Sequence, residues 1–179
     1  MNETDFRKLL TAVLGEVEGT LAGVNPGDVL ALAEAILRAS RVFAAGEGRS
    51  GFVAKCLAMR LAHLGLAAHF AGETTAPAAG PGDLLVAVSG SGATPVTAAR
   101  AQVARQLGVR VAAVTSAGAD SLVELADLVV ALPVVPSQQY GGTRFEQAAL
   151  LLLDALALLL QRRLAQTAAD MDARHATLE

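Results

Sequence analysis

The sequence predicts an α/β fold, a three-layer α-β-α sandwich built around a five-stranded parallel sheet. Two observations lead to this prediction. Short runs that are apolar throughout alternate with longer segments whose apolar residues recur at three- and four-residue spacing. Hydrophobic residues make up 53% of the 179 residues and aromatic residues only 3%, so Ala, Leu and Val must build the core. Continuous apolar runs are typical of strands that helices cover on both faces.

The five expected strands are short apolar runs, each followed by a loop of small or polar residues. They cover residues 42–45, 67–70, 84–88, 109–114 and 128–132. In an open parallel sheet, ligands bind beyond the carboxyl ends of the strands. The loops that begin near Gly46, Gly72, Ser89 and Thr115 all lie at that edge, and we expect them to share one pocket.

Six helices are expected around these strands, at residues 4–22, from 26 onward, 50–64, 95–107, 121–126 and 143–164. The first carries a stripe of Phe, Leu and Val at helical spacing. The second has Asn25 as its N-cap and Pro26 at its first position. Gly65 and Gly108 are natural stops after the third and fourth helices. Residues 133–142, with two prolines and paired glycines, are expected to be irregular.

The length fits one domain with a sizeable core, and no repeat or linker divides the chain. We therefore expect residues 1–179 to form a single domain. It would consist of N-terminal helices in residues 1–40, an α/β core in 41–164 and a polar C-terminal tail in 165–179.

Composition argues against several classes of partner. The formal net charge of −3 and the lack of a dense Lys/Arg run argue against nucleic acid. The single cysteine, Cys56, excludes an internal disulfide and a multi-cysteine metal site. The first residues are acidic and polar, unlike a signal peptide. The longest apolar run, 148–160, is interrupted by Asp154 and is shorter than the ~20 residues of a membrane span. We expect a cytoplasmic protein with no membrane partner.

Residues 88–95, Val-Ser-Gly-Ser-Gly-Ala-Thr-Pro, carry the clearest chemical signal. They join an apolar strand to a helix start, where free N–H groups and the helix dipole favour an anion. The loop contains three hydroxyl side chains and two glycines, namely Ser89, Ser91, Thr94, Gly90 and Gly92. An ordinary turn needs fewer of these residues, so we interpret the loop as a phosphate cradle.

A second glycine loop, Gly46-x-Gly48-x-x-Gly51, matches the dinucleotide-binding fingerprint, and Glu73 lies about where that fold places an acid. Two features argue against a nicotinamide cofactor. Arg49 and Ser50 add donors at the helix start, and a dinucleotide fold does not require the second phosphate-type loop. An isolated fingerprint is a weak signal.

Glu146 lies at the start of the last expected helix, within Gly-Gly-Thr-Arg-Phe-Glu-Gln. A carboxylate there can complement the helix dipole, or it can act as the general base for proton transfer at a carbon next to a carbonyl. The residues alone leave both interpretations open. His63, at the end of the third helix, is by itself more typical of a packed histidine or a dipole partner than of a catalyst.

Three motifs together resemble the sugar isomerase (SIS) domain family, at residues 46–51, 89–94 and 115–116. The resemblance covers nearly the whole chain and implies a flavodoxin-like or Rossmann-like fold. Within this family the chain is most similar to the 6-phospho-3-hexuloisomerases, through residues 54–55, 59–65, 72–74 and 145–147. Ala93 and Pro95 stand where many SIS loops have Glu and a polar residue.

The resemblance implies isomerisation of D-arabino-hex-3-ulose 6-phosphate to D-fructose 6-phosphate through an enediol, in the ribulose monophosphate pathway of formaldehyde fixation. It implies no metal, no organic cofactor, and a homotetramer whose active sites are shared between subunits. Glu146 would be the base, and His63, reaching in from a neighbouring subunit, would move protons on oxygen. The phosphorylated ketose would bind Gly48, Arg49, Ser50, Ser89, Gly90, Ser91, Gly92, Thr94, Thr115 and Ser116.

Three other functions are open. Another SIS isomerase, acting on a pentose or heptose phosphate, usually carries extra domains or a different final-helix motif. A non-catalytic sugar-phosphate sensor would need a helix-turn-helix, which residues 1–40, with little positive charge, do not supply. A catalytically silent oligomerisation subunit is disfavoured because Glu146, His63 and the loop hydroxyls are all present.

Overall fold

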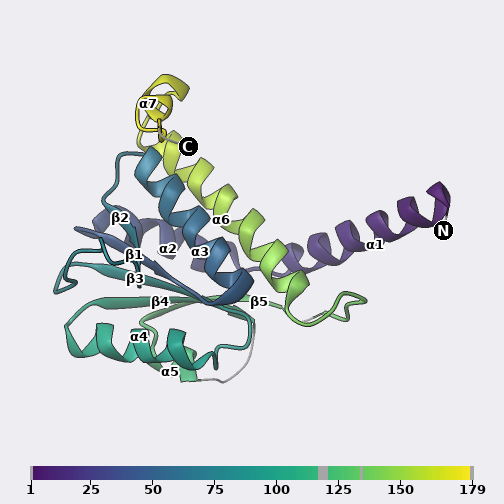
Figure 1. Ribbon diagram of the computed structural model, residues 1–179, viewed down its shortest axis with the longest axis horizontal. Coiled ribbons are helices and arrows are strands. Elements are labelled where there is room, and N and C mark those ends of the chain that lie inside the picture. The colour runs from purple at the N-terminus through teal and green to yellow at the C-terminus, as the bar shows by residue number, and fades with distance from the viewer. Residues whose placement is uncertain (1, 117–120, 134, 178–179) are drawn as a thin grey trace.

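The computed structural model describes residues 2–116, 121–133 and 135–177. Its centre is a sheet of five parallel strands in the order β2-β1-β3-β4-β5 (Figure 1). The strands are β1 (Val42–Ala45), β2 (Ala68–Phe70), β3 (Leu84–Ser89), β4 (Arg110–Ser116) and β5 (Leu128–Leu132). The order places β1 and β3 next to each other, so the two glycine loops that follow them leave the sheet side by side.

Helices cover both faces of this sheet, which confirms the predicted three-layer sandwich. One face carries α2 (Pro26–Arg38), α3 (Gly48–His63) and α6 (Thr143–Arg163), with α3 and α6 packed side by side. The other carries α4 (Pro95–Gln106) and α5 (Ser121–Leu125) (Figure 1). The remaining helices are α1 (Glu3–Ala22) and α7 (Ala168–Asp172).

Alternating residues along the strands pack into two separate hydrophobic cores. Val42 and Ala44 of β1 pack with the larger cluster, under α2, α3 and α6. Phe43 and Ala45 pack with the smaller cluster, under α4 and α5. All six residues of β3 are buried, as expected for a central strand covered on both faces. This continuous burial explains why the central strands read as unbroken apolar runs.

Several helices and strands begin or end at residues other than those predicted. β3 and β4 continue through Ser89 and Ser116, because Ser89 pairs with Thr115 in the ladder. α3 begins at Gly48, so the end of the first glycine loop is the first helical turn. The tail also holds a short helix, α7, which the polar composition did not predict. Thr167 and Asp170 form a capping box at its start.

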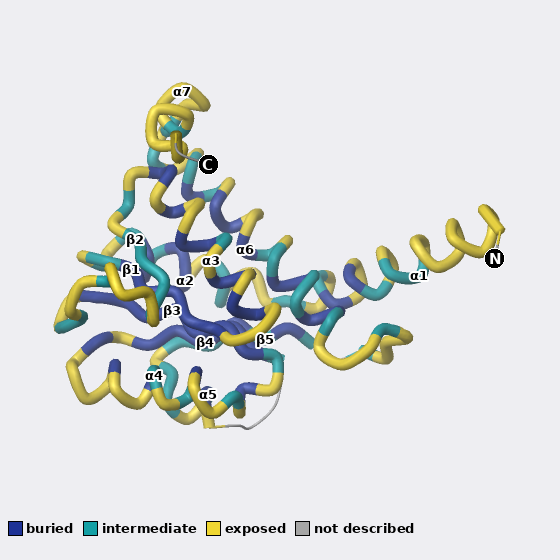
Figure 2. The backbone as a smooth tube through the Cα atoms, viewed as in Figure 1, coloured by how far each residue is buried: buried dark blue, intermediate teal, exposed yellow. Residues whose placement is uncertain are grey.

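α1 is helical as predicted, but its apolar stripe is left uncovered in the single chain. Only Val17 and Thr20 of this helix are buried. The N-terminal half extends away from the body and is exposed along its length (Figure 2). Within the described part of the chain, no single helix has the length and apolarity of a membrane span, although α1 and α2 meet that description together as a pair bent by 78°.

Candidate active site

A cavity of about 600 Å³ opens at the carboxyl edge of the sheet, where the ends of β1, β3 and β4 meet the start of α6. Its walls come from segments that are far apart in the sequence. They are Glu47 and Ser50, then Gly90, Ser91 and Thr94, then Ser116, and finally Val135, Ser137, Gln139, Gly141, Gly142, Arg144, Phe145 and Glu146. The loops after β1 and β3 and the last residue of β4 therefore share one pocket, whereas the loop at Gly72, also predicted to contribute, does not line it.

The loop after β3 presents hydroxyl groups to this cavity. Thr94 is the N-cap of α4, yet its side chain makes no capping bond and lies 3.0 Å from the hydroxyl of Ser89. Ser91 Oγ accepts a bond of 3.2 Å from the N–H of Ala93. Gly92 has a φ of +62°, a conformation that glycine adopts without strain. Ser91 and Thr94 are thus held beside the start of a helix, the arrangement that binds phosphate.

Two of the predicted binding hydroxyls lie behind the cavity wall. Ser89 is buried and contacts Thr94 from below. Thr115 is fully buried, and its Oγ1 has no hydrogen-bond partner among the described residues. Ser116 does line the cavity, and its N–H donates to the carbonyl of Gly90 at 3.3 Å. Ser89 therefore supports Thr94 from within the sheet, and Thr115 lies beside Ser89 on the neighbouring strand.

The loop after β1 uses its glycines for close packing. A Cβ at Gly46 would lie 2.8 Å from the carbonyl oxygen of Ser50 and 2.9 Å from that of Val88. A Cβ at Gly51 would lie 2.9 Å from the carbonyl oxygen of Gly46. Only glycine fits at such separations, and Gly48 adopts a φ of +57°. The fingerprint spacing is thus explained by backbone contact between this loop, α3 and β3.

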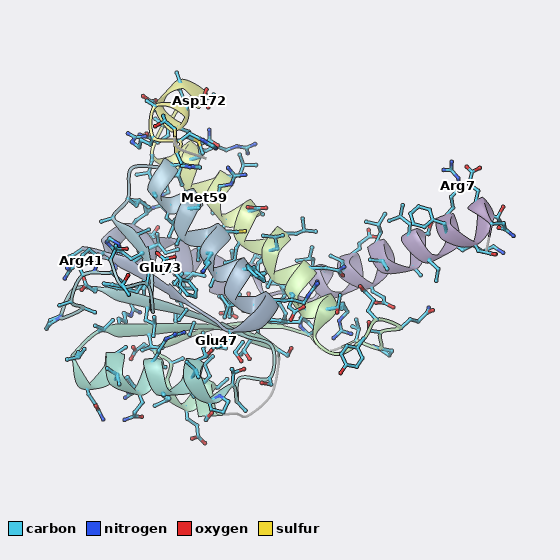
Figure 3. The ribbon with its side chains drawn as sticks, viewed as in Figure 1. Arg7, Arg41, Glu47, Met59, Glu73 and Asp172 are labelled. Atoms are coloured by element: carbon cyan, nitrogen blue, oxygen red, sulfur yellow. The ribbon has the colours of Figure 1, made fainter. Side chains whose placement is uncertain are left out.

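The charged residues of the same loop form ion pairs. Glu47 pairs with Arg100 of α4, and Glu47 lies where the start of α3 approaches the other helical layer (Figure 3). Arg49 donates from its Nε to Oε2 of Glu146. Arg49 is more than half exposed, whereas the Glu146 side chain is 16% exposed. Glu146 is therefore a mostly buried carboxylate, held at the cavity wall by an arginine from a different helix.

His63 is not near this cavity in its own chain. It is the last residue of α3, whereas Ser50 and Arg49 lie in the first turn. A helix of 16 residues is about 24 Å long. His63 is 5% exposed, and its ring stacks on that of His175 with centroids 5.0 Å apart. A catalytic role for His63 remains a prediction that requires a second subunit.

The segment before α6 and the first turn of α6 supply wall residues that the sequence did not single out. Ser137 and Gln139 line the cavity, and so does Arg144, which is 8% exposed. The Nε and Nη1 of Arg144 are buried and have no hydrogen-bond partner among the described residues. The ring of Phe145 lies so close to Gly90 that a Cβ there would be 2.8 Å from it. The sequence feature that could have indicated Ser137 and Gln139 was their place in residues 133–142, between the last strand and the last long helix.

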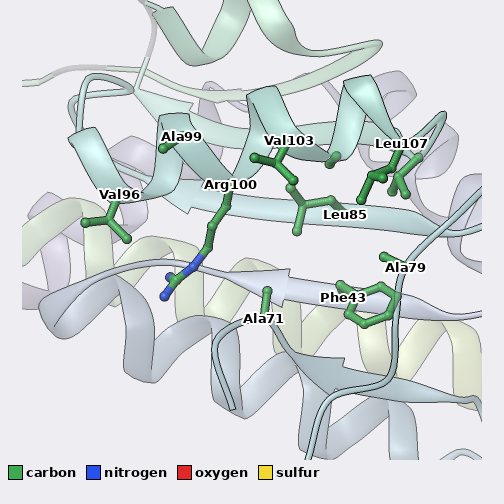
Figure 4. A pocket seen from close by; sticks show the side chains of 11 residues that line it. Phe43, Ala71, Ala79, Leu85, Val96, Ala99, Arg100, Val103 and Leu107 are labelled. Carbon is green, nitrogen blue, oxygen red and sulfur yellow. The ribbon is translucent and has the colours of Figure 1, made fainter. Parts of the chain in front are cut away.

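A second cavity, of about 400 Å³, lies between α4 and the face of the sheet that α4 covers (Figure 4). Its walls are apolar, with Phe43, Leu85, Val103 and Leu107 prominent. The charged residue that lines it, Arg100, already pairs with Glu47. Among the described residues, no group of three His, Cys, Asp or Glu side chains could hold a metal ion. Of the two cavities, the first suits a phosphate-bearing ligand, because hydroxyl groups and a helix start are present there.

Comparison with known proteins agrees with this geometry. The SIS domain family profile matches residues 35–159. The chain belongs to the SIS domain family. The matched region of this SIS domain runs from α2 to near the end of α6 and contains both glycine loops and Glu146.

Several curated relatives of this SIS domain share one name. A 3-hexulose-6-phosphate isomerase of Mycobacterium gastri is 41% identical over 98% of this chain and 92% of its own length. A 3-hexulose-6-phosphate isomerase of Bacillus subtilis is 36% identical, with both chains covered completely. Among solved structures, a Methanococcus jannaschii protein with an inferred function of 3-hexulose-6-phosphate isomerase has a TM-score of 0.88 and 32% identity, covering 96% of this chain and 99% of its own.

Proposed function

We propose that this SIS domain interconverts D-arabino-hex-3-ulose 6-phosphate and D-fructose 6-phosphate, in the ribulose monophosphate pathway of formaldehyde fixation. The observation that carries the proposal is that a phosphate cradle and a mostly buried carboxylate, Glu146, line the same cavity. The relatives named 3-hexulose-6-phosphate isomerase, which match over nearly the full chain, support this choice of substrate.

In this proposal the 6-phosphate binds at the start of α4. The hydroxyls of Ser91, Thr94 and Ser116 and the backbone N–H of Gly90 would donate hydrogen bonds to its oxygens. The N–H of Gly92 instead donates to the carbonyl of Ser89 within the loop. Ser89 would hold the Thr94 hydroxyl in place from below. Binding at one end fixes the distance from the phosphate to the reacting carbons. The open chain of the sugar then extends along the cavity toward α6.

Glu146 acts as the general base. It removes the proton from C2 of the open-chain 3-ketose, and the electron pair of that C–H bond forms the C2=C3 bond of the enediol. The carboxyl of Glu146, whose proton exchanges with solvent while the enediol is bound, then delivers a proton to C3. The hydroxyl on C2 loses one proton, which balances the proton that the C3 oxygen gained, and C2 becomes the carbonyl of fructose 6-phosphate. The reaction needs no external oxidant or reductant, because the atoms and electrons balance within the substrate. Arg49 orients the carboxylate through its bond to Oε2.

We propose that the active unit is a homotetramer acting in the cytoplasm, with each subunit a single domain over residues 1–179. The exposed stripe of α1, formed by Phe6, Leu9, Leu10 and Leu14, provides apolar surface for a neighbouring subunit. Light scattering should give the mass of four chains, and the double variant Leu9→Glu, Leu14→Glu should give a smaller mass. A monomeric wild type would contradict this part of the proposal.

Shared active sites predict a specific rescue. Glu146→Gln and His63→Ala homotetramers should both be impaired. When the two are unfolded, mixed and refolded together, some sites would receive Glu146 from one chain and His63 from another, so activity should reappear. No recovery in mixed tetramers would show that His63 does not complete the site of its neighbour.

The function itself is tested with fructose 6-phosphate labelled with ¹³C at C2. Conversion to the 3-ketose changes C2 from a carbonyl-derived carbon into a CHOH carbon, which gives a new NMR resonance. We expect this resonance to grow to an equilibrium level in the presence of protein. Binding of fructose 6-phosphate without any such resonance would indicate a sensor instead of an enzyme.

A further inference from the structure

Glu16 of α1 lies outside the cavity, yet its carboxylate is bonded to the wall of the site. Oε2 accepts hydrogen bonds from Ser137 Oγ at 2.7 Å and from Gln139 Nε2 at 3.0 Å. Oε1 accepts a bond of 2.8 Å from the backbone N–H of Gln138. Donors from three consecutive residues therefore converge on one side chain that lies 121 to 123 positions away in the sequence.

The bonded segment has no regular secondary structure of its own. Ser137 and Gln139 line the cavity, and the N–H of Gln139 donates back to Ser137 Oγ at 3.0 Å. A segment without a helix or sheet ladder depends on side-chain bonds to hold one conformation. The bonds to Glu16 are contacts that attach this wall to the packed body of the protein.

The same network reaches the helix that carries the base. Gln139 Nε2 also donates to Oε1 of Gln147 at 3.0 Å. Gln147 follows Glu146 in the first turns of α6, and both line a small cavity of about 230 Å³ together with Arg49. A displacement of Gln139 would therefore shift Gln147, which lies beside the Arg49–Glu146 pair.

The position of Glu16 on α1 is itself fixed. The next residue, Val17, is 6% exposed, and Thr20 is 1% exposed, so this part of the helix is packed on the body. The backbone N–H of Gln138, followed by the side chains of Gln139 and Ser137, lowers the pKa of the Glu16 carboxyl, and the positive charge of Arg144 acts in the same direction. Glu16 is therefore a charged acceptor attached to a rigid helical turn.

We propose that Glu16 is a positioning residue for the isomerase reaction. It fixes the Ser137–Gln139 wall against which the sugar lies and, through Gln139 and Gln147, the orientation of the first turns of α6. This inference rests on the proposed function, because it assigns Glu16 a part in that reaction. It also gives the inner half of α1 a role in catalysis, separate from the exposed apolar stripe further toward the N-terminus.

The test compares Glu16→Gln with Glu18→Gln. Glu18 is exposed on the same helix, so both variants lose the same charge from α1. Misplacement of a catalytic wall by about 1 Å can cost roughly 10²-fold in rate. We expect Glu16→Gln to lower kcat by roughly tenfold to a hundredfold, with KM also raised, while Glu18→Gln keeps the wild-type kcat and KM. The melting temperatures of the two variants should stay close to each other.

A double-mutant cycle tests the route of the effect. If Glu16 acts through Gln139, the variant Glu16→Gln, Gln139→Ala should lose little more activity than the more impaired single variant. Amide hydrogen exchange at Gln138 should be faster in Glu16→Gln than in Glu18→Gln, because the acceptor of that N–H is weakened.

The outcomes separate the role of Glu16 from the proposed function. Wild-type turnover with unchanged kcat in Glu16→Gln would overturn the positioning role and leave the proposed function intact. If the fold-loss of activity in the double variant equals the product of the two single fold-losses, Glu16 does not act through Gln139. A wild type and a Glu18→Gln variant that both fail to convert fructose 6-phosphate would overturn the proposed function, and the role of Glu16 with it.

Discussion

The loops after β1 and β3 share their residue types but not their use. Both leave central strands of the sheet, combine glycines with hydroxyl residues and open a helix. After β3, the hydroxyls of Ser91 and Thr94 line the cavity. After β1, Gly46 and Gly51 bring backbone atoms into contact. The loop after β3 presents hydroxyl groups to the cavity, whereas the glycines of the loop after β1 are packed against neighbouring backbone.

Charge separates the two loops further. Among the residues from Ser89 to Thr94 there is no charged side chain, so an anion meets only hydroxyl and N–H donors. The loop after β1 contributes Glu47 and Arg49, and each is engaged with another helix. Glycine spacing alone therefore indicates close backbone packing. Hydroxyl side chains at a helix start that make no capping bond remain available to a ligand.

The largest expected effect concerns the base that Arg49 holds. Glu146→Gln keeps the shape of the side chain but removes its basicity, and general base catalysis contributes about 10²–10⁴-fold. We expect kcat to fall by at least about 10²-fold with little change in KM, measured by steady-state kinetics. Arg49→Gln should cost less than Glu146→Gln, because Arg49 orients the base and does not take the proton. Wild-type turnover in Glu146→Gln would contradict the assigned base.

The packing role of the first loop is tested by Gly46→Ala. The added Cβ would meet two carbonyl oxygens at less than 3.0 Å, so backbone must move, and overpacking of this kind costs about 1–3 kcal/mol. Gly19→Ala is the control, because nothing lies within 4 Å of a Cβ there. Urea denaturation should show Gly46→Ala destabilised and Gly19→Ala at least as stable as the wild type. Equal stability of the two variants would remove the distinction between the loops.

A smaller effect is expected from Ser91→Ala in the second loop. The loss of one hydroxyl donor to a phosphate should raise KM for the sugar phosphate by about tenfold or more, since a hydrogen bond to a charged group contributes about 1.5–3 kcal/mol. Thr11→Ala, on the exposed part of α1, serves as the control. Calorimetry should show that inorganic phosphate binds more weakly to Ser91→Ala than to the wild type or to Thr11→Ala. An unchanged KM and phosphate affinity in Ser91→Ala would show that the cradle is not where the phosphate binds.

The smallest effect on the site should come from the opposite end of β3. Asp83 is 2% exposed. Its burial favours the neutral form, but the hydrogen bonds from Arg41 and from the N–H of Gly80 prevail and lower the pKa of its carboxyl. Because the folded pKa lies below the unfolded value, this stabilisation is present above about pH 4 and is lost as the pH falls through the folded pKa. Asp83→Asn should reduce the free energy of unfolding at neutral pH, and the difference from wild type should shrink in acid.

Asp83→Asn also serves as a stability control for the two loops. Its kcat and KM at neutral pH should match those of the wild type, because Asp83 lies at the edge of the sheet remote from the cavity. A change in KM comparable to that of Ser91→Ala would mean that loss of stability alone perturbs the cradle.

Local patterns predicted most of the fold. The central strands are apolar throughout because both faces are covered, and residues such as Pro26 and Gly65 mark helix ends. The cradle was predictable for the same reason, since its residues are contiguous. The wall formed by Ser137 and Gln139 was not, because it depends on an acceptor from α1 that no local pattern connects to residues 133–142. The exposure of the α1 stripe could not be predicted either, since spacing shows a face but not what covers it.

We propose that Glu146 moves a proton between two carbons of a sugar whose phosphate binds after β3. This proposal is tested by incubating fructose 6-phosphate in D₂O with wild type and with Glu146→Gln, followed by mass spectrometry and NMR. Deuterium at C3 of recovered fructose 6-phosphate with the wild type, and at least about 10²-fold slower incorporation with Glu146→Gln, is the predicted result. Equal incorporation by both proteins, while the 3-ketose is formed, would contradict the role of Glu146.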